Sequence, residues 1–226
     1  MDGFILKSRS PSCGPGDAKI YASAEKGAPL GWTAGIFAAA VAEKFPGLAM
    51  EDEGRLTNYK IREHFLTRLF ALARFREARN NRRMRSLVQF HTQNKLLLMA
   101  QSQKEMRILG NIVANPEHRV PREVWDEYGM HFQLALVRMP RHTAHSNVMQ
   151  HAFGYFSPQL AKKEKEYFLA TLEKYRKGRI PLSSALSVLK SWIVRFEDHY
   201  LVQQTFFEPY PDGLLDLSDS GKGRTP

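Results

Sequence analysis

The stretch Tyr59–Arg79, YKIREHFLTRLFALARFREAR, sets the character of this chain. Its large apolar residues recur at steps of three and four, which places them on one face of an α-helix. They are Ile61, Phe65, Leu69, Leu72 and Phe75. Helical patterns of the same kind follow as far as residue 205, separated by Asn, Pro and Gly breaks. The sequence therefore predicts a mainly α protein.

The pattern after residue 85 predicts an all-α domain whose helices carry recognisable start signals. Ser86 is the predicted cap of one helix and Ser102 of the next, where Glu105 has the spacing of a capping box. The predicted helices are Ser86 to about Ala100, Ser102 to Ala114, Pro121 to about Arg138, His142 to Phe156 with an interruption at Gly154, Leu160 to Lys177, and about Ser183 to Thr205.

The chain before residue 57 has a different, α/β pattern. Residues 3–7 and 18–22 read as short strands, Lys26–Pro29 as a turn, Gly31–Lys44 as an Ala-rich helix, and 48–50 as another short strand. Because so few strands cannot close a sheet, we interpret 1–56 as a partial α/β segment. It is followed by a basic connecting helix (57–85), the helical domain (86–211) and a tail that we expect to be disordered (212–226).

Composition narrows the function classes. The chain of 226 residues has one cysteine, which excludes an internal disulfide, and no apolar run long enough to span a membrane. We expect a soluble cytoplasmic protein that binds no membrane and is able to form oligomers. The net charge of +10 favours an anionic partner, although a basic, solvated surface gives the same total.

Positive charge is concentrated around the connecting helix. The arginines are Arg62, Arg68, Arg74, Arg76, Arg79, Arg82, Arg83 and Arg85. Arginine-rich helices contact nucleic-acid phosphates without reading sequence, so Arg79, Arg82 and Arg83 are candidate nucleic-acid contacts. A solvated basic face is the alternative that the sequence leaves open.

Histidines gather in the segment 142–151. His142 and His145 share a helix face, as zinc ligands do, but no Asp or Glu lies nearby in sequence to orient them. We therefore favour ordinary cleft or core histidines over a metal site. A polar pocket made by His145, Asn147 and His151, binding a base or a phosphate, is the functional alternative.

Two stretches resemble known families. Residues 2–14 (DGFILKSRSPSCG) together with 51–58 (EDEGRLTN) resemble the C-terminal third of the thiouracil desulfidase family. Residues 86–211 resemble the YbgA-like domain of unknown function, which is often fused behind that desulfidase domain. The matching pieces are FHT at 90–92 with KLLLMA at 95–100, HSNVMQH at 145–151 with GYF at 154–156, and EPYP at 208–211.

The desulfidase resemblance implies a [4Fe-4S] cluster held by three cysteines that removes sulfur from a thiolated pyrimidine or nucleotide. Cys13 matches the third ligand, and Ser10 is the candidate catalytic residue. The other two cysteines would lie before residue 1, and one thiolate is too few to hold a cubane cluster. We therefore expect residues 1–56 to be a truncated desulfidase-like segment without activity or cluster of its own.

Two further functions stay open. One is a helical module that binds nucleic acid or nucleotides without catalysis. The other is an interaction protein whose open sheet is completed by another chain.

Overall fold

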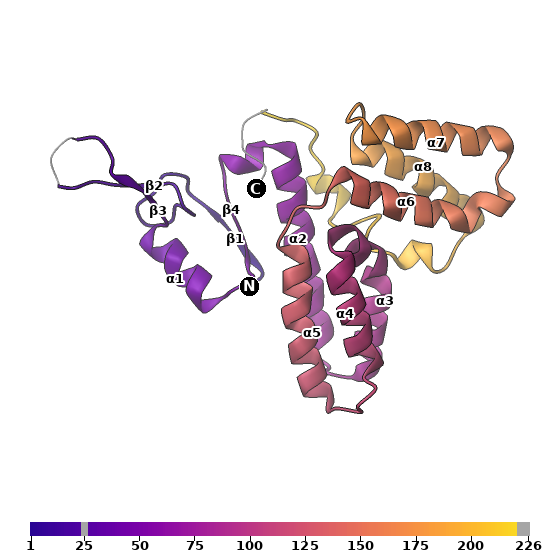
Figure 1. Ribbon diagram of the computed structural model, residues 1–226, viewed down its shortest axis with the longest axis horizontal. Coiled ribbons are helices and arrows are strands. Elements are labelled where there is room, and N and C mark those ends of the chain that lie inside the picture. The colour runs from indigo at the N-terminus through magenta and orange to yellow at the C-terminus, as the bar shows by residue number, and fades with distance from the viewer. Residues whose placement is uncertain (24–26, 221–226) are drawn as a thin grey trace. The chain divides into compact units, whose positions relative to one another are not determined.

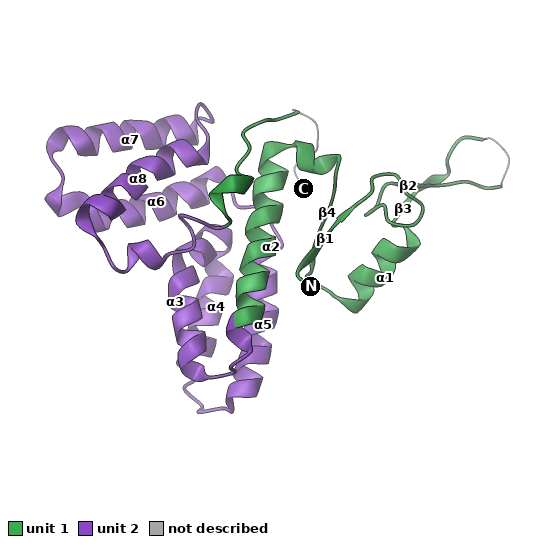
Figure 2. Ribbon diagram, turned by 180° about the vertical axis from the view of Figure 1, so that it is seen from behind, with its two compact units in different colours: residues 1–77, 210–226 green, residues 78–209 purple. Residues whose placement is uncertain are grey.

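The computed structural model describes residues 1–23 and 27–220 and divides the chain into two compact units. The first unit comprises residues 1–77 and 210–226, and the second comprises residues 78–209 (Figure 2). The chain is mainly α with a small α/β part at its start, which confirms the predicted fold class. Within the described residues, no helix has the length and apolarity that crossing a bilayer requires.

The first unit is built around a two-stranded parallel sheet. Strand β1 (Gly3–Leu6) pairs with β4 (Ala49–Asp52), with Gly3 opposite Ala49 and Leu6 opposite Asp52. Figure 1 shows this sheet between helices α1 (Ile36–Lys44) and α2 (Tyr59–Arg79). On one face Phe4 meets Phe37 edge to face, with ring centroids 5.6 Å apart. Residue 3 must be glycine, because a Cβ there would lie 2.5 Å from the backbone carbonyl oxygen of Ala49 in β4.

An antiparallel hairpin is inserted between β1 and α1. It consists of β2 (Ala18–Ile20) and β3 (Gly31–Thr33), in which Lys19 pairs with Trp32. The prediction that a helix opens at Gly31 was wrong, since α1 begins only at Ile36. Trp32 and Thr33 belong to residue types that favour strands, and pairing with β2 takes precedence over helix formation there. The predicted turn at 26–29 lies partly outside the described residues.

Helix α2 follows the short 3₁₀ turn η1 (Arg55–Thr57) and matches the predicted boundaries. Its predicted apolar stripe is buried, with only Leu69 of the five half-buried. Tail residues 212–220 belong to the first unit and begin with the 3₁₀ turn η4 (Asp212–Leu214). The last residues of the predicted disordered tail, 221–226, lie outside the described residues.

The second unit contains two groups of three packed helices, joined by contacts between α3 and α6. The first group is α3 (Met84–Gln101), α4 (Gln103–Ala114) and α5 (Pro121–Leu136). The second is α6 (His142–Phe156), followed by the 3₁₀ turn η2 (Ser157–Gln159), with α7 (Lys162–Arg176) and α8 (Leu182–Phe196). Large aromatic side chains fill the core, among them Trp125, Tyr128, Phe132, Phe156 and Phe168.

Several helix ends differ from the sequence prediction. Ser102 caps α4 as predicted, accepting a hydrogen bond of 3.3 Å from the Glu105 amide. Ser86 is not a cap, because α3 already begins at Met84. Helix α6 runs through Gly154 without a break. Helix α8 stops at Phe196 rather than Thr205, since Glu197 adopts a left-handed conformation with φ of 50°.

The segment after α8 is locked to α3 by a buried glutamine. Beyond the 3₁₀ turn η3 (Leu201–Gln203), the Gln204 amide nitrogen donates to the Thr92 carbonyl at 2.7 Å. Its oxygen accepts from the Leu96 amide at 3.1 Å. This side chain thus contacts the carbonyl of Thr92 and the amide of Leu96, which lie one turn apart in the continuous helix α3. The Thr205 amide continues the pattern by donating to the Gln93 carbonyl at 3.0 Å.

Candidate functional site

The candidate site lies in the loop that leaves β1, residues 7–14. It adjoins Glu53, which directly follows β4, so it occupies the edge at which the carboxyl ends of both parallel strands meet. In open α/β sheets, ligands bind preferentially at this edge. The loop carries both residues singled out by the sequence resemblance, Ser10 and Cys13.

The structure brings Ser10 and Cys13 into direct contact. The Cys13 Sγ atom lies 3.3 Å from Ser10 Oγ, and the Cys13 backbone amide donates to the same oxygen at 3.2 Å. The Ser12 amide donates to it as well, at 3.3 Å. Ser10 therefore organises the loop around the thiol, which is partly exposed.

The start of α1 holds the loop from the other side. The Ile36 and Phe37 amides donate to the carbonyls of Pro11 and Ser12, at 3.2 and 2.8 Å. A Cβ at Gly35 would lie 2.3 Å from the Ser12 carbonyl, so only glycine allows this approach. The first amides of the helix are therefore used to fix the loop rather than to bind an anion.

Asp17 fastens the loop at its base. One carboxylate oxygen accepts from the Ser8 hydroxyl at 2.6 Å and from the Arg9 amide at 2.8 Å. Arg9 has a positive φ of 60°, which is uncommon for a residue other than glycine. A built network of side chains thus maintains an unfavourable backbone conformation directly before Ser10.

The groups around Cys13 favour the ionised form of its thiol. The Ser10 hydroxyl lowers the pKa of Cys13, because it hydrogen-bonds the ionised sulfur, and a backbone hydrogen bond from Lys7 acts in the same direction. Burial and the Glu53 carboxylate act weakly against them. Glu53 itself binds the Lys7 ammonium at 2.7 Å and the Ser8 amide at 2.8 Å, which holds the pKa of Glu53 at about 2.

The described residues do not offer a cluster its ligands. Within 1–23 and 27–220, no three His, Cys, Asp or Glu side chains come close enough together to hold a metal ion. Cys13 is the chain's single cysteine, whereas a cubane cluster is normally held by several thiolates. The residues present therefore do not fit a [4Fe-4S] cluster.

The histidine segment forms α6, and its members point in different directions. His145 Nδ1 lies 2.8 Å from the buried Tyr175 hydroxyl, and the His142 ring stacks on the Tyr175 ring at 5.0 Å. Asn147 and His151 are exposed, one helical turn apart. His145 is thus joined to α7, while Asn147 and His151 lie on an outer face of the helix.

Most arginines of α2 bind other parts of the first unit. Arg76 makes two hydrogen bonds to Asp2, at 2.8 and 3.0 Å, and Arg68 donates to the Gly47 carbonyl at 2.9 Å. Arg62 donates to the carbonyls of residues 216 and 218 in the tail, at 2.6 and 2.7 Å. These guanidinium groups stabilise the first unit. They are therefore not available together as a basic surface for nucleic-acid phosphates.

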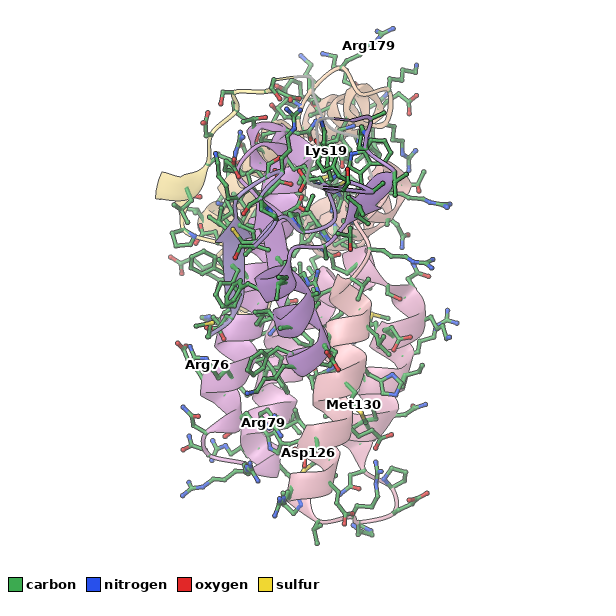
Figure 3. All side chains as sticks on the ribbon, turned by 90° about the vertical axis from the view of Figure 1, so that its left-hand side faces the viewer. Lys19, Arg76, Arg79, Asp126, Met130 and Arg179 are labelled. Atoms are coloured by element: carbon green, nitrogen blue, oxygen red, sulfur yellow. The ribbon has the colours of Figure 1, made fainter. Side chains whose placement is uncertain are left out.

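The three candidate nucleic-acid contacts have different surroundings. Arg79 forms an ion pair with Asp126 of α5 (Figure 3). Arg82 and Arg83 are exposed in the turn between α2 and α3, where Arg82 has a positive φ of 41°. Only these last two therefore present their charge to solvent without an acidic partner within the described part of the chain.

Sequence reasoning missed the residues that support the loop. Asp17, Gly35 and Glu53 were not singled out as site residues, although Asp17 and Glu53 lie within a few residues of predicted strands and Gly35 falls inside a predicted helix. A charged residue just beyond the end of a predicted strand was the available signal. The carboxyl ends of parallel strands lie at one edge of the sheet, where ligands bind. Gln204 gave no signal, since its partners are more than a hundred residues away in sequence.

Comparison with known proteins identifies the family of the helical part of the chain. The family described as "Protein of unknown function (DUF1722)" matches residues 95–211. The "Uncharacterized protein YbgA" of Escherichia coli (strain K12) is 31% identical over 164 residues, covering 69% of this chain and 93% of YbgA. No solved structure matches the chain. The predicted YbgA-like domain is therefore confirmed, and the chain belongs to the DUF1722 family of proteins of unknown function.

Proposed function

We propose that the loop at residues 7–14 supplies one thiolate, Cys13, to a site that removes sulfur from a thiolated pyrimidine or nucleotide. The observation that carries this proposal is the contact between Ser10 and Cys13 at the carboxyl edge of the parallel sheet. Sulfur chemistry requires the ionised form of cysteine, and the Ser10 hydroxyl favours that form. The resemblance of residues 2–14 to thiouracil desulfidases supplies the substrate class.

The other cluster ligands, and with them the activity, would come from an assembly of this chain with a second polypeptide. A single thiolate has no second sulfur with which to bind a cluster. Ser10 therefore orients the thiolate, Gly35 and the start of α1 fix the loop, and Glu53 holds Lys7 beside it. A reducing cytoplasm would keep the thiol free.

An apolar surface next to the loop supports a second polypeptide as the completing partner. Ile36, which directly follows the loop-binding Gly35, is 83% exposed, and Trp32 on β3 is 67% exposed. Leu30 and Phe37 are exposed as well. These four exposed apolar residues lie within eight positions of the chain, next to the loop, and their number there favours a protein contact.

The first experiment measures thiolate formation in the intact chain. Alkylation of Cys13 by iodoacetamide is followed against pH in the wild type and in Ser10→Ala. The thiol pKa should be lower in the wild type, since the variant loses the hydroxyl that stabilises the thiolate. Ser12→Ala is the matched control, because its side chain makes none of the hydrogen bonds to Sγ. Identical profiles for Ser10→Ala and the wild type would contradict the role of Ser10.

The second experiment tests the activity. The chain is joined behind the cysteine-bearing part of a thiouracil desulfidase and reconstituted with iron and sulfide without oxygen. We expect the absorbance of an iron–sulfur cluster at about 400 nm, and the release of sulfide from 2-thiouracil. The same fusion carrying Cys13→Ser should have lost both. A Cys13→Ser fusion as active as its parent would remove Cys13 from the site.

Nucleic-acid binding through the turn between α2 and α3 is a second candidate. The exposed Arg82 and Arg83 favour it, whereas the ion pair of Arg79 with Asp126 limits the contribution of Arg79. Binding of a single-stranded RNA should weaken as salt rises and should fall further in Arg82→Ala/Arg83→Ala than in Arg79→Ala. Affinity that does not change with salt would exclude this candidate.

A further inference from the structure

Helix α5 has an exposed face with an unusual distribution of residue types. Met130, Leu134 and Val137 are 61%, 57% and 49% exposed, at spacings of four and three residues. Such spacing places them in one stripe along the helix. We call this stripe the α5 apolar stripe. Figure 3 shows Met130 and Asp126 along the same side of the helix.

The two ends of the same face carry opposite charges. Glu123, Asp126 and Glu127 precede the stripe, and Arg138 follows it one residue beyond Val137. At 100° per residue, the helical positions Glu123, Asp126, Glu127, Met130 and Leu134 fall within one third of the circumference of α5. The helix ends at Leu136, but Val137 keeps helical backbone angles and so extends this face to Arg138. The face is therefore acidic at its first end, apolar in the middle and basic at its last end.

We propose that this face binds the same face of a second copy of the chain, as an antiparallel helix pair with two-fold symmetry. An interface of this kind brings one patch against itself, so the patch must be self-complementary. An antiparallel pair centred midway between Met130 and Leu134 brings Met130 against the partner's Leu134, and Leu134 against the partner's Met130. Parallel pairing would bring equal charges together instead.

The charges fit the same register. Arg138 of one copy then lies opposite the partner's Asp126, with the partner's Glu123 about 4.5 Å further along the axis. Asp126 and Glu127 already bind Arg79 and Arg119 within the chain. Glu123 is therefore the carboxylate that is left for the guanidinium of the partner's Arg138, and it is exposed. Both ends of the pair make this contact by symmetry.

The size of the face predicts a weak dimer. The stretch from Glu123 to Arg138 is about 24 Å long, which is short for a helix-pair interface. Interfaces of that size belong to transient complexes, so dissociation is expected at micromolar concentrations. Opposite charges at its two ends make the association sensitive to salt.

The test is sedimentation equilibrium of the full chain under reducing conditions, between about 1 and about 300 µM. The wild type should pass from monomer to dimer within that range and form nothing larger. Leu134→Glu should weaken dimerisation at least about tenfold, since it brings carboxylates into the apolar stripe. Val194→Glu is the matched control, because Val194 is 77% exposed on α8 and should leave dimerisation unchanged.

A charge exchange fixes the orientation of the pair. Glu123→Arg and Arg138→Glu should each weaken the dimer, and the double variant should recover most of the loss. A chain that stays monomeric up to the highest concentration overturns the proposal, and so does a dimer that Leu134→Glu leaves intact. If the double variant does not recover the dimer affinity, the antiparallel register is wrong. None of these outcomes depends on Cys13, so they are separate from the test of desulfuration.

Discussion

The two units reach their folds by different means. The helical unit buries large aromatic side chains, and its two tryptophans, Trp125 and Trp192, are almost fully enclosed. The α/β unit has only short strands, leaves Trp32 and Ile36 in water, and relies on polar side chains to fix its loops. The helical unit is stabilised mainly by close apolar packing, whereas the loops of the α/β unit depend on individual hydrogen bonds.

Apolar packing and single hydrogen bonds determine different features of the two units. Apolar helical packing fixes the shape of the second unit. A loop held by Ser10, Asp17 and the start of α1 conserves the position of one thiol. Single residues in each unit are the most informative, since the helical unit depends on one buried glutamine, Gln204, and the loop of the α/β unit on one glycine, Gly35.

The largest effect is expected at Gln204. Replacement by alanine removes both hydrogen bonds to α3 and leaves the Thr92 carbonyl and the Leu96 amide without that partner. Unsatisfied buried groups of this kind destabilise by about 3 kcal/mol. Urea unfolding followed by tryptophan fluorescence measures the loss, because Trp125 and Trp192 report on the helical unit.

The control for this prediction is the neighbouring residue. Gln203 is exposed, so Gln203→Ala should change the free energy of unfolding by less than about 0.5 kcal/mol. Equal stability of the two variants would mean that the α3 helix closes its own hydrogen bonds when Gln204 is absent. The helical unit would then depend on its apolar core alone.

The second effect is expected at Gly35 in the α/β unit. Alanine there would bring Cβ to 2.3 Å from the Ser12 carbonyl, so the loop or α1 must move. Such overpacking destabilises by about 2 kcal/mol. In this variant the alkylation of Cys13 should report a higher thiol pKa than in the wild type, because Ser10 no longer lies beside the sulfur. Tryptophan fluorescence from the helical unit should be unchanged.

Gly16→Ala is the matched control for Gly35→Ala. No atom lies within 4 Å of a Cβ at residue 16, so this variant should leave both readouts as in the wild type. A Gly35→Ala protein with an unaltered thiol pKa would show that the start of α1 does not position the loop. The α/β unit would then owe the thiol environment to Ser10 and Lys7 alone.

The contrast between the units also decides what the sequence could predict. Helix α2 was predicted with its boundaries, because its apolar period is long and regular. The strand at Gly31–Thr33 was mistaken for the start of a helix, because its pairing with Ala18–Ile20 is a tertiary contact. Ser10 and Cys13 were identified by resemblance, whereas the contacts that Asp17, Gly35 and Glu53 make with the loop depend on its folded conformation.

The third effect concerns the histidine segment of the helical unit. Tyr175→Phe removes the hydroxyl that lies 2.8 Å from His145 Nδ1 but retains the ring that stacks on His142. The loss of one such hydrogen bond destabilises by about 1 kcal/mol. Tyr167→Phe, on the exposed side of the same helix, should have no effect on urea unfolding. Equal effects of the two variants would show that the hydroxyl contributes nothing to the packing of α6 on α7.

The smallest effect is expected at the ion pair of Lys7 and Glu53, which is exposed and so contributes little to stability. Its signature is the titration of Glu53, whose pKa is held at about 2 by the Lys7 ammonium and the Ser8 amide. Because the folded pKa is below the ordinary value of 4.5, the contribution of Glu53 is complete above pH 4.5 and is lost as the pH falls toward about 2.

Lys7→Met tests this assignment by carboxyl ¹³C NMR. The pKa of Glu53 should rise toward 4.5 without reaching it, because the Ser8 amide still donates to the carboxylate. Asp2 is the internal control, because its pKa is lowered by Arg76 and not by Lys7 and should be the same in both proteins. If Glu53 titrates at its ordinary pKa in the wild type, the carboxylate does not hold Lys7 beside the loop. The thiol would then be positioned only from the side of Ser10 and α1, and the α/β unit would depend on fewer polar contacts than the structure assigns to it.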